Sequence, residues 1–230
     1  VKKPGIFRNA LIVTQFVIAI TLICTTLVIF QQFRYLKDAP LGYNTASLIS
    51  IPIKQDEQGK QIVGKMRTLL ASQPAVVSVS GSTVNFGVGK DRSTSKQSFG
   101  FDYKGKSVGT NYIECDYDIL KTLGVQLKEG RDFSTAFTHD STDAVIITES
   151  MAKQLGEKNP VGISFYSDSS RPKWNVIGVI PDFHLYSMHE ETEPITISMA
   201  ERSISYALVR VNTQNPMSTM KMLEKTYAQV

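Results

Sequence analysis

The chain has 230 residues, a formal net charge of +4, 20% charged residues and two cysteines. The lysines and arginines behind this mild positive charge are scattered rather than clustered, which argues against a nucleic-acid-binding protein. Cys24 and Cys115 lie in very different surroundings, so the sequence has neither a disulfide framework nor a C-x-x-C redox or zinc pattern. Because the sequence begins at Val1 and stops at Val230 inside a predicted helix, we interpret it as a piece of a longer protein.

An uncharged apolar run lies near the N-terminus. As a helix, the 21 residues of 10–30 would be about 30 Å long, which is the thickness of the hydrocarbon core of a bilayer. The threonines in the run can donate their hydroxyls to the helix's own carbonyls, whereas Gln15 is expected to face another helix. A buried core helix would show a polar face, and a signal peptide would be shorter with a small-residue cleavage site. We therefore predict a transmembrane helix at 10–33, after a cytoplasmic flank at 1–9 and before a linker at 34–47.

Basic residues flank this run unequally. Lys2, Lys3 and Arg8 precede it, whereas Arg34 and Lys37 follow it. Positive charge accumulates on the cytoplasmic side of membrane helices, so this bias favours a cytoplasmic N-terminus. The remainder of the chain is then predicted to form a domain on the outer face of the membrane.

The start of this domain predicts a β-α-β unit over residues 48–84. Residues 48–53 and 76–84 have strand patterns, and Pro52 directs the first of these strands to an edge or a bulge. Residues 58–72 between them predict an amphipathic helix. The apolar face of this helix consists of Ile62, Met66, Leu69 and Leu70.

The middle of the domain is rich in short strands. Residues 98–116 predict a hairpin, because Phe99, Phe101 and Tyr103 alternate with polar residues before the turn Lys104-Gly105-Lys106. Further elements follow in chain order: a short helix at 117–123 closed by Gly124, a turn at 130–133, a strand at 144–147, a helix capped by Thr148 and ending at Leu155 before Gly156, a turn at Asn159-Pro160, and strands at 163–166 and 174–180.

The domain ends with two strands, at 194–199 and 204–211, and a helix. Asn215 caps this helix and Pro216 starts it, with Met217, Met220, Leu223 and Tyr227 predicted to face inward. The element order indicates an α+β fold in two lobes. The predicted lobes are a membrane-near lobe at about 48–118 plus 194–230, and an inserted lobe at about 119–193.

One segment matches the phosphate-loop pattern G-x-x-x-x-G-K-S letter for letter. It runs from Gly100 to Ser107. A nucleotide-binding loop must lead into a helix at its Lys-Ser pair, but Val-Gly-Thr-Asn-Tyr follows here and has no helical character. The residues inside the match also alternate as a strand does. We therefore predict a hairpin turn and no nucleotide site.

Two histidines near acidic residues form the other candidate site. His184 and His189 lie five residues apart, with Asp182, Glu190 and Glu191 close in sequence. This spacing is poor for a metal site, so a hydrogen-bonded loop is the preferred interpretation. His139 is isolated in a polar segment. There is also no G-x-S-x-G elbow and no pair of carboxylates marked as an acid–base couple. We predict no catalytic, cofactor or metal residues and assign no substrate-binding residues.

Several segments together resemble one family of membrane proteins. Residues 8–16, which lead into the apolar run, and 32–36 with 42–44, which follow it, resemble the start of a permease half in ABC transporters of the MacB/FtsX type. Three later segments are also similar to that family: Leu123 to Phe133, which contains Gly-Arg-Asp-Phe; Asn159-Pro160-Val161-Gly162, followed by Ile163 in place of the usual lysine; and Val176 to His184, with Pro181 where lysine is common.

The resemblance implies the second half of a large permease in the inner membrane. Residues 48–230 would then be a MacB-like periplasmic core domain that does not catalyse a reaction but moves as ATP is hydrolysed by a separate cytoplasmic ABC ATPase. The implied partners are that ATPase, the other half of the permease or a second copy, membrane lipid, and a periplasmic adaptor or lipoprotein. The implied function is export or extraction of a peptide, drug or lipoprotein.

Two other functions remain open from the sequence. A membrane-anchored extracytoplasmic sensor or binding module would also have a spanning helix followed by a soluble domain. A periplasmic hydrolase would need a reactive constellation, which the sequence does not show. Because a sensor and a permease differ in the number of spanning helices, the coding sequence beyond Val230 would separate them.

Overall fold

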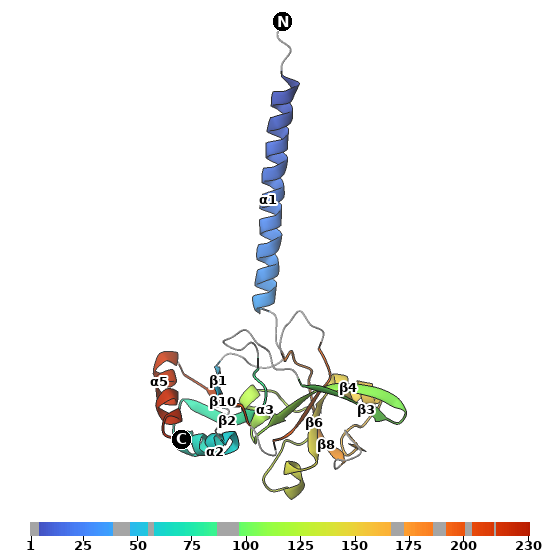
Figure 1. The fold of residues 1–230 in the computed structure, drawn as a ribbon, viewed down its shortest axis with the longest axis vertical. Coiled ribbons are helices and arrows are strands. Elements are labelled where there is room, and N and C mark those ends of the chain that lie inside the picture. The colour runs from blue at the N-terminus through green and yellow to red at the C-terminus, as the bar shows by residue number, and fades with distance from the viewer. Residues whose placement is uncertain are drawn as a thin grey trace. The chain divides into compact units, whose positions relative to one another are not determined.

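The computed structural model describes residues 5–38, 47–54, 58–86, 97–166, 173–185, 192–200, 204–213 and 215–230. The chain divides into two compact units, Val1–Pro40 and Leu41–Val230. The first consists of one long helix, and the second is a sheet domain with helices (Figure 1). Together they form the predicted α+β protein with an N-terminal apolar helix.

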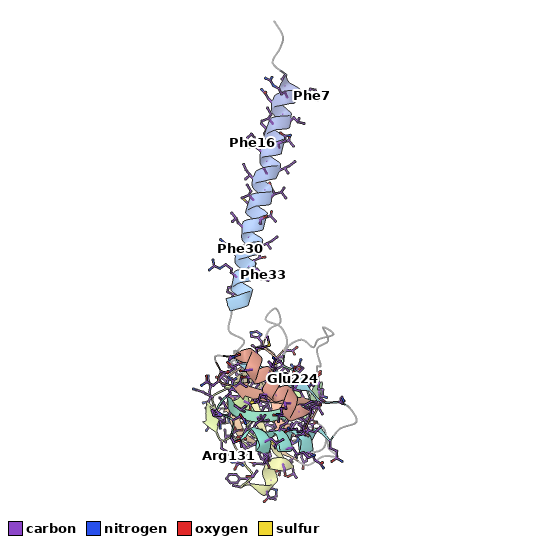
Figure 2. All side chains as sticks on the ribbon, turned by 90° about the vertical axis from the view of Figure 1, so that its left-hand side faces the viewer. Phe7, Phe16, Phe30, Phe33, Arg131 and Glu224 are labelled. Atoms are coloured by element: carbon purple, nitrogen blue, oxygen red, sulfur yellow. The ribbon has the colours of Figure 1, made fainter. Side chains whose placement is uncertain are left out.

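The first unit is helix α1 (Ile6–Asp38), which has 33 residues. It contains the predicted membrane segment and continues through 34–38, which we had predicted to be linker. Its apolar side chains project outward, as the labelled phenylalanines show in Figure 2. The predicted return of threonine hydroxyls is confirmed: each donates to the carbonyl four residues earlier. The four bonds are Thr14 to Ala10 at 2.9 Å, and Thr21 to Val17, Thr25 to Thr21 and Thr26 to Leu22 at 2.8 Å.

In its described residues, the second unit contains one mixed sheet of ten strands. Most neighbours are antiparallel, but β4–β9 and β6–β8 are parallel pairs. The strands in spatial order are β1 (Leu48–Pro52), β10 (Tyr206–Val211), β2 (Val76–Ser82), β4 (Lys106–Cys115), β9 (Ile195–Met199), β6 (Ala144–Thr148), β8 (Trp174–Ile180) and β5 (Glu129–Gly130), while β3 (Ser98–Tyr103) pairs with β4 and β7 (Ser164–Phe165) pairs with β8.

The predicted β-α-β unit is confirmed, but strand β10, from near the C-terminus, lies between its two strands. Strands β1 and β2 flank β10, and each pairs with it antiparallel, so β1 and β2 are parallel to each other but not adjacent. Pro52 lies on β1 at the end of the sheet, as predicted, where a missing N–H does not interrupt a ladder.

Helices α2 (Gly59–Leu70) and α5 (Pro216–Tyr227) belong to this end of the domain (Figure 1). On α2, Ile62, Met66 and Leu70 are buried as predicted, but Leu69 is exposed and Val63 takes its place. The inward face predicted for α5 is wrong at two positions: Met217 is 70% exposed and Met220 is 42% exposed.

The reason lies in which side of α5 packs against the domain. Its buried positions are Thr219, Leu223 and Thr226, which follow the i, i+4, i+7 spacing of one helical stripe. This stripe includes two threonines that hydrophobicity alone would place outside. Asn215 caps the helix as predicted, because its side-chain oxygen accepts a hydrogen bond from the Ser218 amide at 3.2 Å.

The other end of the domain carries the predicted hairpin and the short helix α4 (Glu149–Leu155), whereas the short helix α3 (Ile119–Leu123) lies against β2 and β10. Strands β3 and β4 form the hairpin, which extends to the side of the domain opposite α2 and α5 (Figure 1). Helices α3 (Ile119–Leu123) and α4 (Glu149–Leu155) end at Gly124 and Gly156, both with positive φ, and a 3-10 turn covers Thr138–Ser141. The sequence predicted that these two helices end at Gly124 and Gly156, and the structure confirms both ends.

Three groups of buried apolar side chains hold the domain together. One lies among β1, β2, β10, α2 and α5; a second lies among α3, β4, β6 and β9; the third lies among β3, β4, β6, β7, β8 and α4. Strands β2 and β4, which join the two ends of the sheet, share a single pair, Ser82 with Cys115. The lobe boundaries predicted from sequence remain a prediction.

Candidate functional site

The phosphate-loop match folds as the hairpin that the alternation predicted. Gly100 to Tyr103 belongs to β3, and Lys106 begins β4. Lys104 and Gly105 both have positive φ, at 52° and 78°, which is the backbone geometry of a tight hairpin turn. The Gly105 amide donates to the Asp102 carboxylate at 3.0 Å. Because a strand follows the Lys-Ser pair, this turn does not have the geometry of a phosphate-binding loop.

The candidate loop around His184 has a structural role in the part that is described. The Asp182 carboxylate accepts a hydrogen bond from the Ser150 amide at 2.8 Å, so Asp182 caps the first turn of α4. The sequence placed Thr148 at the N-cap of this helix, and Thr148 does occupy that position with extended backbone, but its side chain makes no cap hydrogen bond. The Thr148 hydroxyl instead lies 3.1 Å from the Ser150 hydroxyl and accepts from the Ile195 amide at 2.9 Å.

His189, Glu190 and Glu191 lie outside the described residues. Within the described ranges, no group of three or more histidine, cysteine, aspartate or glutamate side chains is placed to hold a metal ion. His139 is 4.0 Å from the Asp143 carboxylate, and its side chain is largely exposed. Cys115 is buried, its thiol donates to the Ser198 carbonyl at 3.3 Å, and burial raises its pKa well above the ordinary value. Such a thiol is a poor nucleophile at neutral pH.

The segment Gly130 to Phe133 makes a very close approach to strand β8. Gly130 has φ of 79° and pairs with Gly178. A Cβ on Gly130 would lie 2.1 Å from the Ile177 carbonyl oxygen, and a Cβ on Gly178 would lie 2.6 Å from that of Arg131. Only glycine fits at these two facing positions.

Arg131 forms a two-point ion pair with a buried aspartate. Its Nη1 and Nη2 atoms donate to the two oxygens of Asp140 at 2.6 and 2.7 Å, and the Ser134 amide adds a third bond at 2.8 Å. Burial of Asp140 disfavours its charge, but these hydrogen bonds outweigh burial and lower its pKa. The guanidinium also lies 3.9 Å from the centre of the Phe137 ring. The pair fixes the segment between β5 and β6.

The pKa of Asp132, the residue after Arg131, is shifted in the opposite direction to that of Asp140. Burial is the main reason that its pKa is raised, and the charges of Asp118 and Asp140 add to this effect. A hydrogen bond of 2.7 Å from the Phe133 amide to its carboxylate lowers the pKa only in part. Asp132 therefore costs stability when it is ionised.

The three later segments that carried the family resemblance converge on β8. The Gly-Arg-Asp-Phe segment begins in β5, which pairs with β8. The segment at 159–162 forms a turn in which the Gly162 amide donates to the Val176 carbonyl of β8 at 2.8 Å. Asp182, just beyond β8, caps α4. These family motifs thus build the frame around one strand, and the sequence alone did not show that they meet.

Sequence reasoning missed an ion pair near the joint between β2 and β4. Arg67 of α2 donates to the Asp116 carboxylate at 2.7 Å and to the Tyr117 carbonyl at 3.3 Å. The Asp116 side chain is 4% exposed. The Ser80 hydroxyl donates to the Asp116 carbonyl at 3.0 Å. No spacing rule links Arg67 to Asp116, because their elements meet only through the tertiary fold.

A groove of about 470 Å³ lies on the β3–β4 hairpin. Gly100 and Gly109 are among the residues that line it, and they are cross-strand partners. The other lining residues are Ser98, Phe99, Thr110, Asn111, Glu193 and Pro194. This volume is in the range of about 300–1,000 Å³ that is usual for ligand sites. The groove is therefore a candidate binding site in the described part of the domain.

With this geometry in view, comparison with known proteins identifies the family. Residues 10–223 match the family model described as the MacB-like periplasmic core domain, so the match includes most of α1 and nearly all of the sheet domain. The chain belongs to the MacB-like periplasmic core domain family. A search of curated proteins returned no match.

Two solved structures support the assignment at the level of the fold. The periplasmic region of MacB from Actinobacillus actinomycetemcomitans aligns with a TM-score of 0.53 at 16% identity, over 81% of this chain and 86% of that structure. The extracellular domain of the ABC-type transporter YknZ from Gram-positive bacteria aligns with a TM-score of 0.51 at 14% identity, over 79% and 93%. The chain is thus a MacB-like domain of an ABC transporter permease, as its sequence motifs predicted.

Within that family the candidate sites have different roles. Helix α1 is the one described helix that is long and apolar enough to cross a membrane. The family is the permease part of an ABC transporter, which is generally not catalytic. The contacts around β8 join β5 and α4 to this strand, and the groove on the hairpin is a hollow on the surface of the domain.

Proposed function

We propose that this chain is the mechanical permease component of a MacB-type exporter. Helix α1 anchors it in the inner membrane with the N-terminus in the cytoplasm, and the sheet domain lies in the periplasm. A separate cytoplasmic ABC ATPase hydrolyses ATP, and the membrane helices pass the resulting movement to the sheet domain. That movement exports or extracts a peptide, a drug or a lipoprotein.

One observation carries the proposal: a single family match extends over both the apolar helix and the sheet domain. A domain that works by transmitting movement must also be stiff. The Arg131–Asp140 pair, the facing glycines 130 and 178 and the Asp182 cap are contacts that keep the sheet domain rigid.

The partner is tested by purifying the tagged full-length protein from membranes in mild detergent. An ABC ATPase should co-purify, and its ATP hydrolysis should depend on the permease. Purification without an ATPase, together with a cytoplasmic signalling region in the full-length product, would support the membrane-anchored sensor instead.

The location is tested by cysteine labelling in spheroplasts. Gln154 lies on the exposed side of α4, so Gln154→Cys should react with a membrane-impermeant maleimide without lysis. The parent chain is the matched control, because Cys115 is buried and Cys24 lies in the apolar helix. Labelling that requires lysis would place the sheet domain in the cytoplasm and contradict the proposal.

A further inference from the structure

Within helix α1, the side chain of Gln15 differs from the other polar side chains of the apolar run 10–30. Apart from Cys24, those polar residues are four threonines. Each threonine hydroxyl donates to a carbonyl of the helix itself, so it needs no outside partner. The Gln15 carboxamide is exposed and makes no hydrogen bond to any described residue. A carboxamide can both donate and accept, and this whole capacity is open.

The position of Gln15 keeps its carboxamide away from water at the end of the run. Gln15 follows Ala10 by about 7.5 Å along the helix axis, at about 1.5 Å per residue. The hydrocarbon core of a bilayer offers no donor or acceptor, so an unpaired carboxamide there is costly. Long lysine and arginine side chains avoid this cost by extending to the interface, but the glutamine side chain is shorter. The carboxamide of Gln15 therefore needs a hydrogen-bonding partner inside the membrane.

Another transmembrane helix is the partner that fits this place. A helix satisfies its own backbone groups, so it can lie in the hydrocarbon core and still present a polar side chain to Gln15. Asparagine, glutamine, serine, threonine and histidine form such bonds between membrane helices. Because α1 is the one described helix that is long and apolar enough to cross a membrane, the described residues do not supply this partner.

Apolar side chains on the same side of α1 provide the surrounding contact. Leu11, Ile18 and Leu22 are spaced from Gln15 by alternating steps of four and three residues, which places all four on one helical stripe. The three apolar side chains are each more than half exposed within the protein. A single polar residue in an apolar seam fixes how two helices pair, because a wrong partner or register leaves that residue unpaired.

We propose that Gln15 forms a hydrogen bond with a polar side chain of another transmembrane helix, which packs along Leu11, Ile18 and Leu22. The inference rests on the membrane insertion of α1 proposed above and adds the contact by which α1 recognises its neighbour. The threonines of α1 do not take part in this recognition, since their hydroxyls are already bonded.

The test uses the full-length protein in its native membranes, with a photo-activated benzophenone amino acid placed at Leu22. Irradiation should cross-link this position to a transmembrane helix that carries a hydrogen-bonding side chain at the depth of Gln15. Mass spectrometry of the cross-linked peptide identifies that helix. A cross-link to lipid alone, or to a helix without a polar side chain at this depth, would overturn the inference.

Matched variants test the hydrogen bond itself. Gln15→Leu keeps an apolar helix but removes the carboxamide, so the yield of the cross-link should fall at least about threefold, the size expected for one hydrogen bond between membrane helices. Gln15→Asn keeps a carboxamide and should keep the cross-link. Thr14→Val removes a hydroxyl that already bonds to Ala10, so it should leave the yield unchanged. Equal yields in Gln15→Leu and the parent, or equal losses in Gln15→Leu and Thr14→Val, would overturn the inference.

Resistance to alkaline extraction separates this inference from the proposed function. If alkali extracts the parent protein, α1 is not inserted in the membrane, and both proposals fail. If the parent resists extraction and Gln15→Leu cross-links as well as the parent does, the inference about Gln15 fails and the anchoring of the permease stands.

Discussion

The apolar helix and the sheet domain use the same side chains in opposite ways. Ile20 of α1 is 58% exposed, whereas Ile146 of β6 is fully buried. Transfer of an isoleucine side chain out of water is favourable, whether the side chain enters a protein core or the lipid core of a membrane. The helix therefore needs a membrane where the sheet domain supplies its own interior. In the sheet domain, the burial of a side chain within the protein therefore indicates how much that side chain stabilises the fold. In helix α1, exposure within the protein does not indicate instability, because the membrane takes the place of a protein core.

Charged substitutions in helix α1 should have the strongest effect, which is loss of membrane attachment. In the 230-residue chain expressed by itself, in which α1 is the one described candidate span, replacing both Ile20 and Ile23 with arginine should release the chain from membranes, because each charge near the centre of a span costs about 2.5–3.5 kcal/mol. Resistance to alkaline extraction measures this, and the double alanine variant at the same positions is the control, which should stay in the membrane. An arginine variant that resists extraction as the parent does would refute α1 as a lipid-exposed span.

A strained position in the domain should give the next largest effect. Gly130→Ala introduces a Cβ 2.1 Å from the Ile177 carbonyl oxygen at a positive φ, so we expect a loss of at least about 4 kcal/mol and an unfolded domain. Gly105→Ala also has a positive φ but meets nothing within 4 Å, so it should cost only about 1 kcal/mol. Urea unfolding followed by Trp174 fluorescence gives both values, and equal losses would show that the contact with β8 is not tight.

The same substitution, isoleucine to alanine, can be made in the core of the sheet domain and in helix α1. Ile146→Ala should lower the free energy of unfolding of the domain by about 2–5 kcal/mol, because it leaves a cavity in the core. Ile20→Ala should leave this free energy unchanged within about 0.5 kcal/mol, since its side chain contributes nothing to the domain core. A clear loss of domain stability in Ile20→Ala would mean that the helix packs on the domain.

The Arg131–Asp140 pair predicts a pH dependence that belongs to the sheet domain alone. Asp140→Asn should cost about 2 kcal/mol at neutral pH, because it weakens hydrogen bonds to a charged group. The folded pKa of Asp140 is lowered, so its contribution is present above the unfolded pKa and is lost as the pH falls through the folded value, below about pH 4. Unfolding curves of parent and variant should therefore converge in acid. A difference that does not depend on pH would rule out a role for the charge.

The smallest effect is expected next to that pair, with the opposite sign. The folded pKa of Asp132 is raised, so stability is lost as the pH rises through that value. Asp132→Asn keeps an acceptor for the Phe133 amide and removes the charge, so it should stabilise the domain at neutral pH by at most about 1 kcal/mol. Thermal unfolding at neutral and acidic pH measures the change, and destabilisation at neutral pH would contradict the assignment.

The sequence predicted the local elements well where a local signal exists. The period of apolar residues predicted α2 and the β3–β4 hairpin, and glycines predicted the ends of α3 and α4. It failed where a distant element supplies the partner. Thr148 is the N-cap residue of α4, but the side chain of Asp182 rather than that of Thr148 makes the cap hydrogen bond. Helix α5 packs through Thr219 and Thr226 rather than through Met217 and Met220.

The sequence by itself determined the apolar span, the α+β class and the family, because each depends on residue types along a continuous stretch of chain. Only the tertiary structure decided that β10 lies between β1 and β2, that three family motifs meet at β8, and that Gly100 and Gly109 line one groove. The physical reason is that strand pairing and ion pairs join residues far apart in the chain. Their energies depend on distances that no local pattern records.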